Sequence, residues 1–278
     1  ISAMSLKNLL TEIQTGIWLI ETNSPEHYSE IVKQIKLGAF VNEKQEKFYS
    51  VIGKEATNRQ TGQSEMKDQV AVISMIGEMT KYNSWCSLGA QGYVNEILSA
   101  QNNPDIKGII LKIDGPGGNA DAIAEFANIK NLITKPVVAL VDKAYSLHYW
   151  VAAMLGDRIM MNNNITAGVG SIGAMLSFNK PKDEIIMIRP EESADKNQEY
   201  LDALEGNYEK IQAKLSVLAQ KFQNGVKLAR PNVDASALSG KTYFAEEAIQ
   251  LGLADEMGSL ESAYSWILAK SEINKLKS

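Results

Sequence analysis

The sequence has almost none of the residues that build disulfide frameworks or zinc sites. It contains one cysteine, Cys86, and two histidines, His27 and His148, among 278 residues. A single cysteine excludes an intrachain disulfide, and one cysteine with two histidines argues against a zinc site. No histidine and asparagine constellation stands near Cys86, so the sequence does not favour a thiol protease. We expect neither a metal nor a cofactor.

The sequence also lacks a net positive charge and long apolar runs. The net charge is −5 and the isoelectric point is about 5.3. A surface for nucleic acid or anionic lipid needs a basic patch, so this balance disfavours both partners. The longest uncharged stretch, Ile159–Asn179, carries three consecutive asparagines and three glycines, which argues against a membrane span. No signal-peptide pattern is visible, and we expect a cytoplasmic protein.

The first quarter of the chain differs from the rest in its pattern of apolar and polar residues. Apolar residues recur at helical spacing over residues 5–21 and 25–38. A polar, charged stretch at residues 42–67 follows, and we interpret it as a linker with room for a short helix. The sequence therefore predicts an N-terminal helical arm and linker over residues 4–66, and a larger domain over residues 67–270.

Strand and helix patterns alternate from residue 69 onward. Buried strands are predicted at residues 70–76, 108–113, 135–141 and 158–161, with helices at residues 89–101, 121–133 and 146–155. This alternation implies right-handed crossovers and a mostly parallel sheet, the α/β class. In such sheets, sites form at the carboxyl ends of strands. A long helix over residues 200–230 and a short unit over residues 242–255 are predicted downstream.

A glycine-rich turn, Asp114-Gly115-Pro116-Gly117-Gly118, follows the second of these strands. We expect it to lead directly into a helix. Adjacent glycines there leave backbone N–H groups unshielded, and such groups bind anions or a developing oxyanion. A plain strand-to-helix turn is an equally good interpretation of the motif alone. A phosphate loop is disfavoured because the Gly-Lys-Ser/Thr ending is missing.

Ser146 lies at the junction between a predicted strand and an apolar helix. The positive end of a helix dipole favours alkoxide character there, as a nucleophile requires. The competing interpretation is an ordinary N-cap serine, and for this residue alone it is the stronger one. The surrounding residues do not form Gly-x-Ser-x-Gly, so an α/β-hydrolase is disfavoured.

A serine nucleophile needs a base, and the sequence offers few histidines for that role. His148 is two residues from Ser146, and such positions do not face each other on a helix. His27 lies in the N-terminal arm, where nothing places it near Ser146. A Ser-His-Asp triad is therefore hard to build. The remaining base is a lysine with a pKa lowered by burial, and the downstream candidates are Lys180, Lys182 and Lys196.

The segment Gly168-Val169-Gly170-Ser171-Ile172-Gly173 spells G-x-G-x-x-G. A dinucleotide fingerprint directly follows the first strand of a βαβ unit. Here the motif follows a short fourth strand and three asparagines, so nucleotide binding is disfavoured.

Taken in order, five segments resemble peptidase family S49, the family of SppA-like signal peptide peptidases and phage head maturation proteases in the ClpP/crotonase superfamily. They are residues 111–118 with the glycine turn, residues 135–139, residues 146–152 around Ser146, residues 170–173 with Gly-Ser-Ile-Gly, and residues 242–258. The resemblance covers roughly residues 69–265. It implies a ClpP/crotonase-like spiral of βαβ units, here with an N-terminal helical arm and a helical C-terminal part.

The resemblance also implies roles for particular residues. Ser146 corresponds to the nucleophile, and Gly117 and Gly118 offer oxyanion N–H groups. Lys196 stands about where the family keeps its general-base lysine, and Ser171 matches a serine that orients this lysine. The implied activity is a serine endopeptidase with a Ser-Lys dyad that cleaves extended peptides, such as signal-peptide remnants or phage scaffold and capsid segments.

The same resemblance implies a homo-oligomeric ring, in the cytoplasm or, for a prophage-encoded protein, in a phage procapsid. One departure keeps a second function open, because Leu147 and His148 replace the small residues that the family places after its nucleophile. Bulk beside the serine favours a catalytically inactive assembly protein. A crotonase-like acyl-CoA enzyme is a third reading, since it needs an oxyanion pair but no serine nucleophile.

Overall fold

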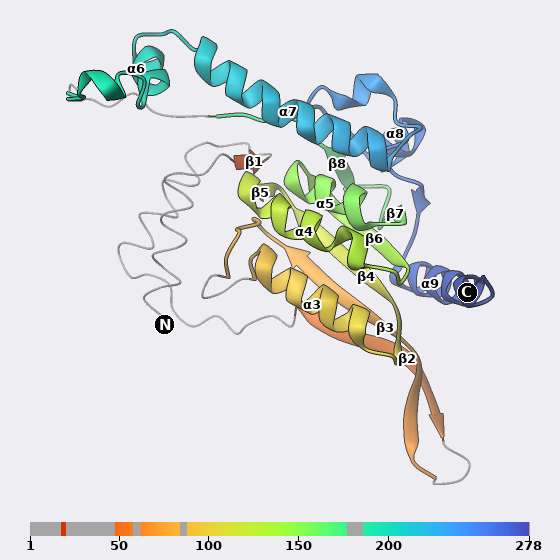
Figure 1. Cartoon of the computed structure of the whole chain (residues 1–278). Coiled ribbons are helices and arrows are strands. Elements are labelled where there is room, and N and C mark those ends of the chain that lie inside the picture. Colours follow the sequence, from red (N-terminus) through yellow and green to blue (C-terminus); the bar gives the residue numbers. More distant parts are fainter. Residues whose placement is uncertain (1–17, 21–47, 58–61, 84–87, 177–185, 278) are drawn as a thin grey trace, which may run out of the picture.

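The structure is a computed structural model of the chain, and it describes residues 18–20, 48–57, 62–83, 88–176 and 186–277 (Figure 1). Its strands are β1 (Trp18–Ile20), β2 (Tyr49–Thr57), β3 (Ser64–Ile76), β4 (Ile106–Gly115), β5 (Gly117–Asn119), β6 (Val137–Tyr145), β7 (Arg158–Met161), β8 (Gly168–Gly170), β9 (Thr242–Phe244) and β10 (Glu256–Met257).

The α-helices in the same ranges are α3 (Ala90–Asn102), α4 (Ile123–Ile129), α5 (Leu147–Leu155), α6 (Gln198–Leu204), α7 (Glu209–Ala229), α8 (Ala245–Gln250) and α9 (Leu260–Lys275). Short 3-10 turns are η1 (Ala120–Ala122), η2 (Lys130–Leu132), η3 (Glu191–Ser193) and η4 (Ala235–Leu238). Within these ranges, none of the helices combines the length and the apolar character needed to cross a membrane.

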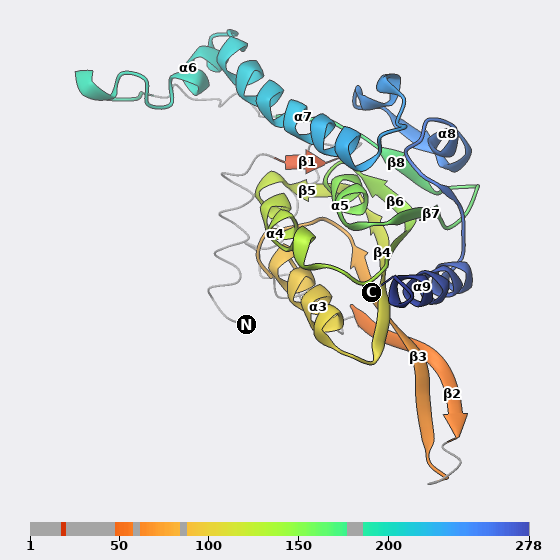
Figure 2. The same ribbon diagram turned by 45° about the vertical axis from the view of Figure 1, so that its right-hand side comes forward.

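The central sheet is mostly parallel, with the order β10-β7-β6-β4-β3-β2. The pairs from β3 through β4, β6 and β7 to β10 are all parallel, and β2 joins β3 antiparallel at the edge. Helices α3, α4 and α5 follow successive strands and cover one face, while α9 packs on β4 and β6 (Figures 1 and 2). The α/β class and the βαβ units predicted from the sequence are confirmed.

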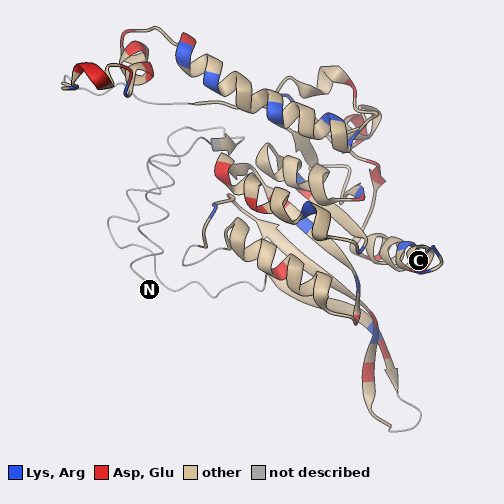
Figure 3. Cartoon of the chain, viewed as in Figure 1, with Lys and Arg blue, Asp and Glu red and all other residues tan. Residues whose placement is uncertain are grey.

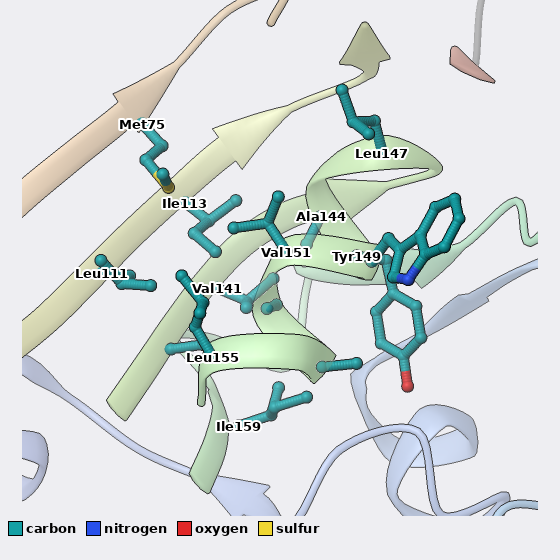
Figure 4. Packing of buried hydrophobic residues seen from close by; sticks show 14 of the residues in the cluster. Met75, Leu111, Ile113, Val141, Ala144, Leu147, Tyr149, Val151, Leu155 and Ile159 are labelled. Atoms are coloured by element: carbon teal, nitrogen blue, oxygen red, sulfur yellow. The ribbon is translucent and has the colours of Figure 1, made fainter. Parts of the chain in front are cut away.

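Each core strand is apolar on both faces because helices cover both faces. Successive side chains of a strand point to opposite sides, and the buried residues divide accordingly. Ile109, Leu111 and Ile113 of β4 belong to the larger core under α3, α4 and α5, and Ile110 belongs to the smaller core under α9. Figure 4 shows Val151 of α5 in the larger core, close to Ile113.

The sheet divides at β6, and this division positions the site. The first half of β6 pairs in parallel with β7, from Val138↔Arg158 to Val141↔Met161. Its last three residues pair in parallel with β8 instead, ending at Tyr145↔Gly170. The carboxyl end of β6 therefore lies beside the carboxyl end of β8, and the two following residues are neighbours.

Several local predictions are wrong. Residues 18–20, expected in a helix, form β1, and the described part of the expected linker forms β2 and the start of β3. The domain boundary expected at residue 67 falls inside β3. The helix expected over residues 200–230 is two helices, because the chain turns at Gly206 with a φ of 92°. The other expected N-terminal helical residues lie outside the described residues.

Candidate active site

Ser146 sits where β6 ends and α5 begins, in a conformation that few residues other than glycine adopt. Its φ is 51° and its ψ is −118°. Its backbone N–H donates to the carbonyl oxygen of Gly170 at 2.8 Å, and its side chain is 2% exposed. The side chain makes no capping hydrogen bond to α5, so the N-cap interpretation loses its main support. A positive φ at a serine costs free energy and is typical of a functional site.

A second buried serine with a positive φ lies beside it. Because β6 and β8 pair at Tyr145↔Gly170, Ser146 and Ser171 are the next residues on neighbouring strands. The φ of Ser171 is 54°, and its N–H donates to the carbonyl oxygen of Lys241 at 2.8 Å. The structure thus brings together two of the serines singled out in the sequence. Residues 168–170 of the G-x-G-x-x-G segment form strand β8 here.

The glycine turn does not begin a helix, contrary to expectation. Gly117 and Gly118 form the short strand β5, and a 3-10 turn follows before α4 starts. A Cβ atom at Gly118 would lie 2.0 Å from the carbonyl oxygen of Met79. Only glycine allows this close approach of two backbones. Gly117 and Gly118 therefore belong to a strand rather than to a helix, and α5 packs against this strand.

His148 is buried on α5 and holds the glycine strand to this helix. The backbone N–H of Gly117 donates to His148 Nδ1 at 3.0 Å, so the ring proton lies on Nε2. Burial lowers the pKa of His148 to about 4, and the imidazole is therefore neutral at pH 7. Sequence reasoning excluded His148 as a base but missed this structural role. A histidine inside an apolar helix was the available signal.

The predicted oxyanion donors consequently differ from each other. The Gly117 N–H already donates to His148. The Gly118 N–H is on the next peptide group of β5 and takes no part in that hydrogen bond. Sequence reasoning considered Leu147 only for its bulk and missed it as a donor, although its N–H is the first of α5. The first N–H groups of a helix have no acceptor within the helix, and the residue after a nucleophile at a strand-to-helix turn commonly supplies an oxyanion donor.

The structure does not bring Lys196 to Ser146 within one chain. Lys196 is exposed between η3 and α6, and its carbonyl oxygen accepts a hydrogen bond from Arg189 at 2.8 Å. Figures 1 and 2 both place α6 well away from α5. Lys180, Lys182, His27 and Cys86 lie outside the described residues.

One lysine that the sequence did not single out lies close to the two serines through its backbone. Lys241 accepts the Ser171 N–H, as described above, and directly precedes β9, which pairs with β8. Its side chain is exposed. Among the described residues, no group of histidine, cysteine and carboxylate side chains is placed to hold a metal ion.

Comparison with known proteins gives a consistent family assignment. Residues 130–274, just over half of the chain, match Peptidase family S49. The chain is 28% identical over 231 residues to the chloroplastic serine protease SPPA of Arabidopsis thaliana, which covers 75% of this chain and 33% of that protein. It is 28% identical over 187 residues to the capsid assembly protease C of Escherichia phage lambda, covering 61% of this chain and 40% of the phage protein.

A solved structure of a membrane-bound stomatin-specific protease mutant in complex with a substrate peptide is also similar. It has 16% identity and a TM-score of 0.46, and the match covers 69% of this chain and 76% of the other. The chain spans between 33% and 54% of the length of the first curated relatives that it matches.

Proposed function

The chain belongs to peptidase family S49, and we propose that it is a serine endopeptidase with Ser146 as its nucleophile. The observation that carries the proposal is the backbone of Ser146, a buried serine with a φ of 51° at the carboxyl end of a parallel strand. An N-cap serine needs no positive φ and caps its helix with its side chain. A strained turn that presents a hydroxyl is what nucleophile positions require.

In the proposed reaction, a lysine side chain acts as the base and accepts the hydroxyl proton of Ser146 while Oγ bonds to the peptide carbonyl carbon. The C–N bond then breaks, and the proton passes from the lysine to the leaving amine. Water hydrolyses the ester and restores Ser146. We assign the base to Lys196, as the family resemblance implies. Lys196 lies just before α6, Ser146 lies just before α5, and these two helices are well apart (Figure 2). We therefore propose that a neighbouring subunit supplies the lysine.

The negative oxygen that forms during attack needs N–H donors. We propose the Gly118 N–H as one donor and the Leu147 N–H as the second. The Gly117 N–H, expected in this role from the sequence, is donated to His148 in the structure and takes part only if that hydrogen bond breaks. Ser171, adjacent to Ser146 across β6 and β8, is proposed to orient the incoming lysine.

The proposed substrates are extended peptides. An extended chain adds a strand to an exposed sheet edge, where backbone hydrogen bonds bind it irrespective of sequence. We propose two sources, namely signal-peptide remnants and phage scaffold or capsid segments. The names of two relatives support them, a putative signal peptide peptidase SppA of Enterococcus faecium and the capsid assembly protease C of phage lambda. A homo-oligomeric ring, which the family resemblance implies, is part of the proposal because a neighbouring copy is proposed to supply the lysine.

The test is labelling with a serine-directed phosphonate probe, followed by intact-mass and peptide mass spectrometry. Wild type and Ser216→Ala, which changes an exposed serine of α7, are expected to gain one adduct on Ser146. Ser146→Ala is expected to gain none. Labelling that fades in Lys196→Ala but not in Lys241→Ala supports Lys196 as the base. An adduct-free wild type, both assembled and dissociated, would contradict the peptidase proposal.

One observation favours a second candidate, an inactive assembly protein of the same family. His148 occupies the N–H of Gly117, so a predicted oxyanion donor is already bound. An inactive protein would remain unlabelled by the probe and would still form stable oligomers in analytical ultracentrifugation. Labelling of Ser146 would exclude this candidate.

A further inference from the structure

A short segment from the beginning of the chain lies on the glycine strand of the candidate site. β1 pairs antiparallel with β5, in the register Trp18↔Asn119, Leu19↔Gly118 and Ile20↔Gly117. About a hundred residues of sequence separate these two strands, and Figures 1 and 2 both show them side by side. Both glycines expected to serve the oxyanion thus have a partner on β1.

The backbone directions of β5 show which edge β1 covers. The Met79 N–H donates to the Gly117 carbonyl oxygen at 2.9 Å, and the Asn119 N–H donates to the Met79 carbonyl oxygen at 2.8 Å. One edge of β5 is therefore taken by Met79. Successive peptide groups of a strand point to opposite edges, so the N–H and C=O of Gly118 face the other edge. Leu19 stands opposite Gly118 on that edge.

Leu19 anchors β1 in the body of the protein. Its side chain is 1% exposed and belongs to the larger core. Full burial of a leucine side chain is a strong apolar contact, so β1 is held by a side chain as well as by its backbone. An extended peptide bound at a sheet edge uses the same two elements, namely backbone pairing and a buried side chain.

We propose that β1 occupies the strand position of a peptide substrate, so that the chain competes for its own site and slows reaction there until this segment is displaced. The site that holds Leu19 is then a substrate subsite for an aliphatic side chain. One edge accepts one strand, and a tethered segment competes at a high effective concentration. The inference rests on the proposed function for its catalytic consequence, but the pairing of β1 with β5 is independent of catalysis.

The first experiment measures binding of a fluorescein-labelled peptide of residues 15–23 to full-length proteins by anisotropy. Leu19→Asp places a charge where an apolar side chain is buried and is expected to free the edge. We expect this variant to bind the peptide at least tenfold more tightly than wild type. The matched control is Leu228→Asp, since Leu228 is 77% exposed on α7, and it is expected to bind like wild type.

A peptide with aspartate in place of its leucine is expected not to bind the Leu19→Asp protein. Equal binding of the unmodified peptide to all three proteins would overturn the proposal. If Leu19→Asp does not fold, Leu19→Ala is measured by amide hydrogen exchange instead. The Gly118 amide is then expected to exchange at least tenfold faster than in wild type, and an unchanged rate would overturn the proposal.

The second experiment separates this inference from the proposed function by following the rate of phosphonate labelling at Ser146. We expect Leu19→Asp to be labelled several-fold faster than wild type and Leu228→Asp. Equal rates would refute the blocking strand and leave the peptidase intact. Selective peptide binding without labelling of any protein would support the strand position and refute the peptidase.

Discussion

The backbone conformation of Ser146 is strained, and a serine with a purely structural role would not need this strain. A φ of 51° with a ψ of −118° suits glycine and strains a residue with a Cβ. We expect Ser146→Gly to raise the free energy of unfolding by about 1 kcal/mol relative to Ser146→Ala. The control is Ala144→Gly, two residues earlier in β6, where the glycine variant should be less stable than the protein with alanine. Denaturant unfolding measures both, and no gain for glycine at position 146 would contradict the strain.

His148 predicts a pH dependence of stability. Burial lowers its pKa to about 4 from an unperturbed value of 6.5. Between these values the unfolded chain binds a proton that the folded chain does not, so the free energy of unfolding falls as the pH falls. The contribution of His148 amounts to about 3 kcal/mol by pH 4.

The matched variant for this prediction is His148→Asn, because an amide oxygen can accept the Gly117 N–H in place of Nδ1. Denaturant titrations at pH 7, 5.5 and 4 compare it with wild type. The decline below pH 6.5 should be shallower for the variant by about 3 kcal/mol over the window. Parallel curves would mean that His148 does not titrate as a buried group.

The close packing around Gly118 in β5 predicts that a larger residue at this position destabilises the protein. A methyl group there would lie 2.0 Å from the Met79 carbonyl oxygen, whereas one at Gly173 finds its nearest atom at 4.0 Å. Overpacking of this kind costs about 1–3 kcal/mol. We expect Gly118→Ala to lower the free energy of unfolding by that amount and Gly173→Ala to change it little. Thermal or denaturant unfolding decides, and equal effects would contradict the close backbone approach.

At the scale of elements, α7 holds the helix that begins at the candidate nucleophile. Trp150 of α5 stacks on Phe222 of α7, with ring centroids 4.6 Å apart and planes at 9°. Gly225 allows this contact because a Cβ there would lie 2.7 Å from Trp150 Nε1. Tyr149 adds a second tie, since its hydroxyl donates to the Leu253 carbonyl oxygen at 2.9 Å. The start of α5 is thus fixed from the C-terminal half of the chain.

Phe222→Ala is expected to lower the free energy of unfolding by about 3–5 kcal/mol, the usual cost of truncating a buried aromatic side chain. Val217→Ala is the control on the same helix, because Val217 is 54% exposed, and its effect should stay within about 0.5 kcal/mol. Urea unfolding followed by circular dichroism measures both. Similar losses for the two variants would show that α7 does not anchor α5 through this stack.

The elements that the sequence predicted well are those whose pattern depends on local burial. The strand runs at residues 106–115 and 137–145 are apolar on both faces, and the helices after them carry one apolar side. Periodicity reports such burial directly. Ser146 was placed correctly at a strand-to-helix junction for the same reason.

The elements that were predicted wrongly from the sequence depend on contacts with distant residues. Leu19 lies near the end of residues 5–21, a stretch whose apolar spacing predicted a helix, yet it pairs with Gly118, about a hundred residues later. β2 is half polar because it lies at the edge of the sheet, so its composition resembles a linker. The hydrogen bond from Gly117 to His148 joins two segments whose proximity follows only from the fold.

At the scale of the molecule, two parts project from the compact body. They are the outer half of the β2–β3 hairpin, and α6 with the first half of α7 (Figures 1 and 2). Charged residues are frequent on both projections, whereas the strands inside the body are nearly free of them (Figure 3). Lys196 lies between η3 and α6, two residues before the helix that begins the second projection. A side chain on a projection can reach another copy more readily than the centre of its own chain.

This arrangement predicts complementation between two inactive proteins. Ser146→Ala retains Lys196, and Lys196→Ala retains Ser146, so a mixed oligomer contains some sites with both groups if the lysine comes from a neighbour. We expect each variant alone to cleave a fluorogenic peptide at background rate, and an equimolar mixture to recover about a quarter of the wild-type rate if neighbours associate at random.

The control for this mixture is the double variant Ser146→Ala/Lys196→Ala combined with either single variant, which should remain inactive because no site regains both groups. The subunits have to exchange for the test to work, so the mixture is dissociated in mild denaturant and reassembled, and its oligomeric state is verified by light scattering. Reassembled mixtures that stay at background would exclude a lysine from the neighbour. The base would then have to reach Ser146 from within the same chain.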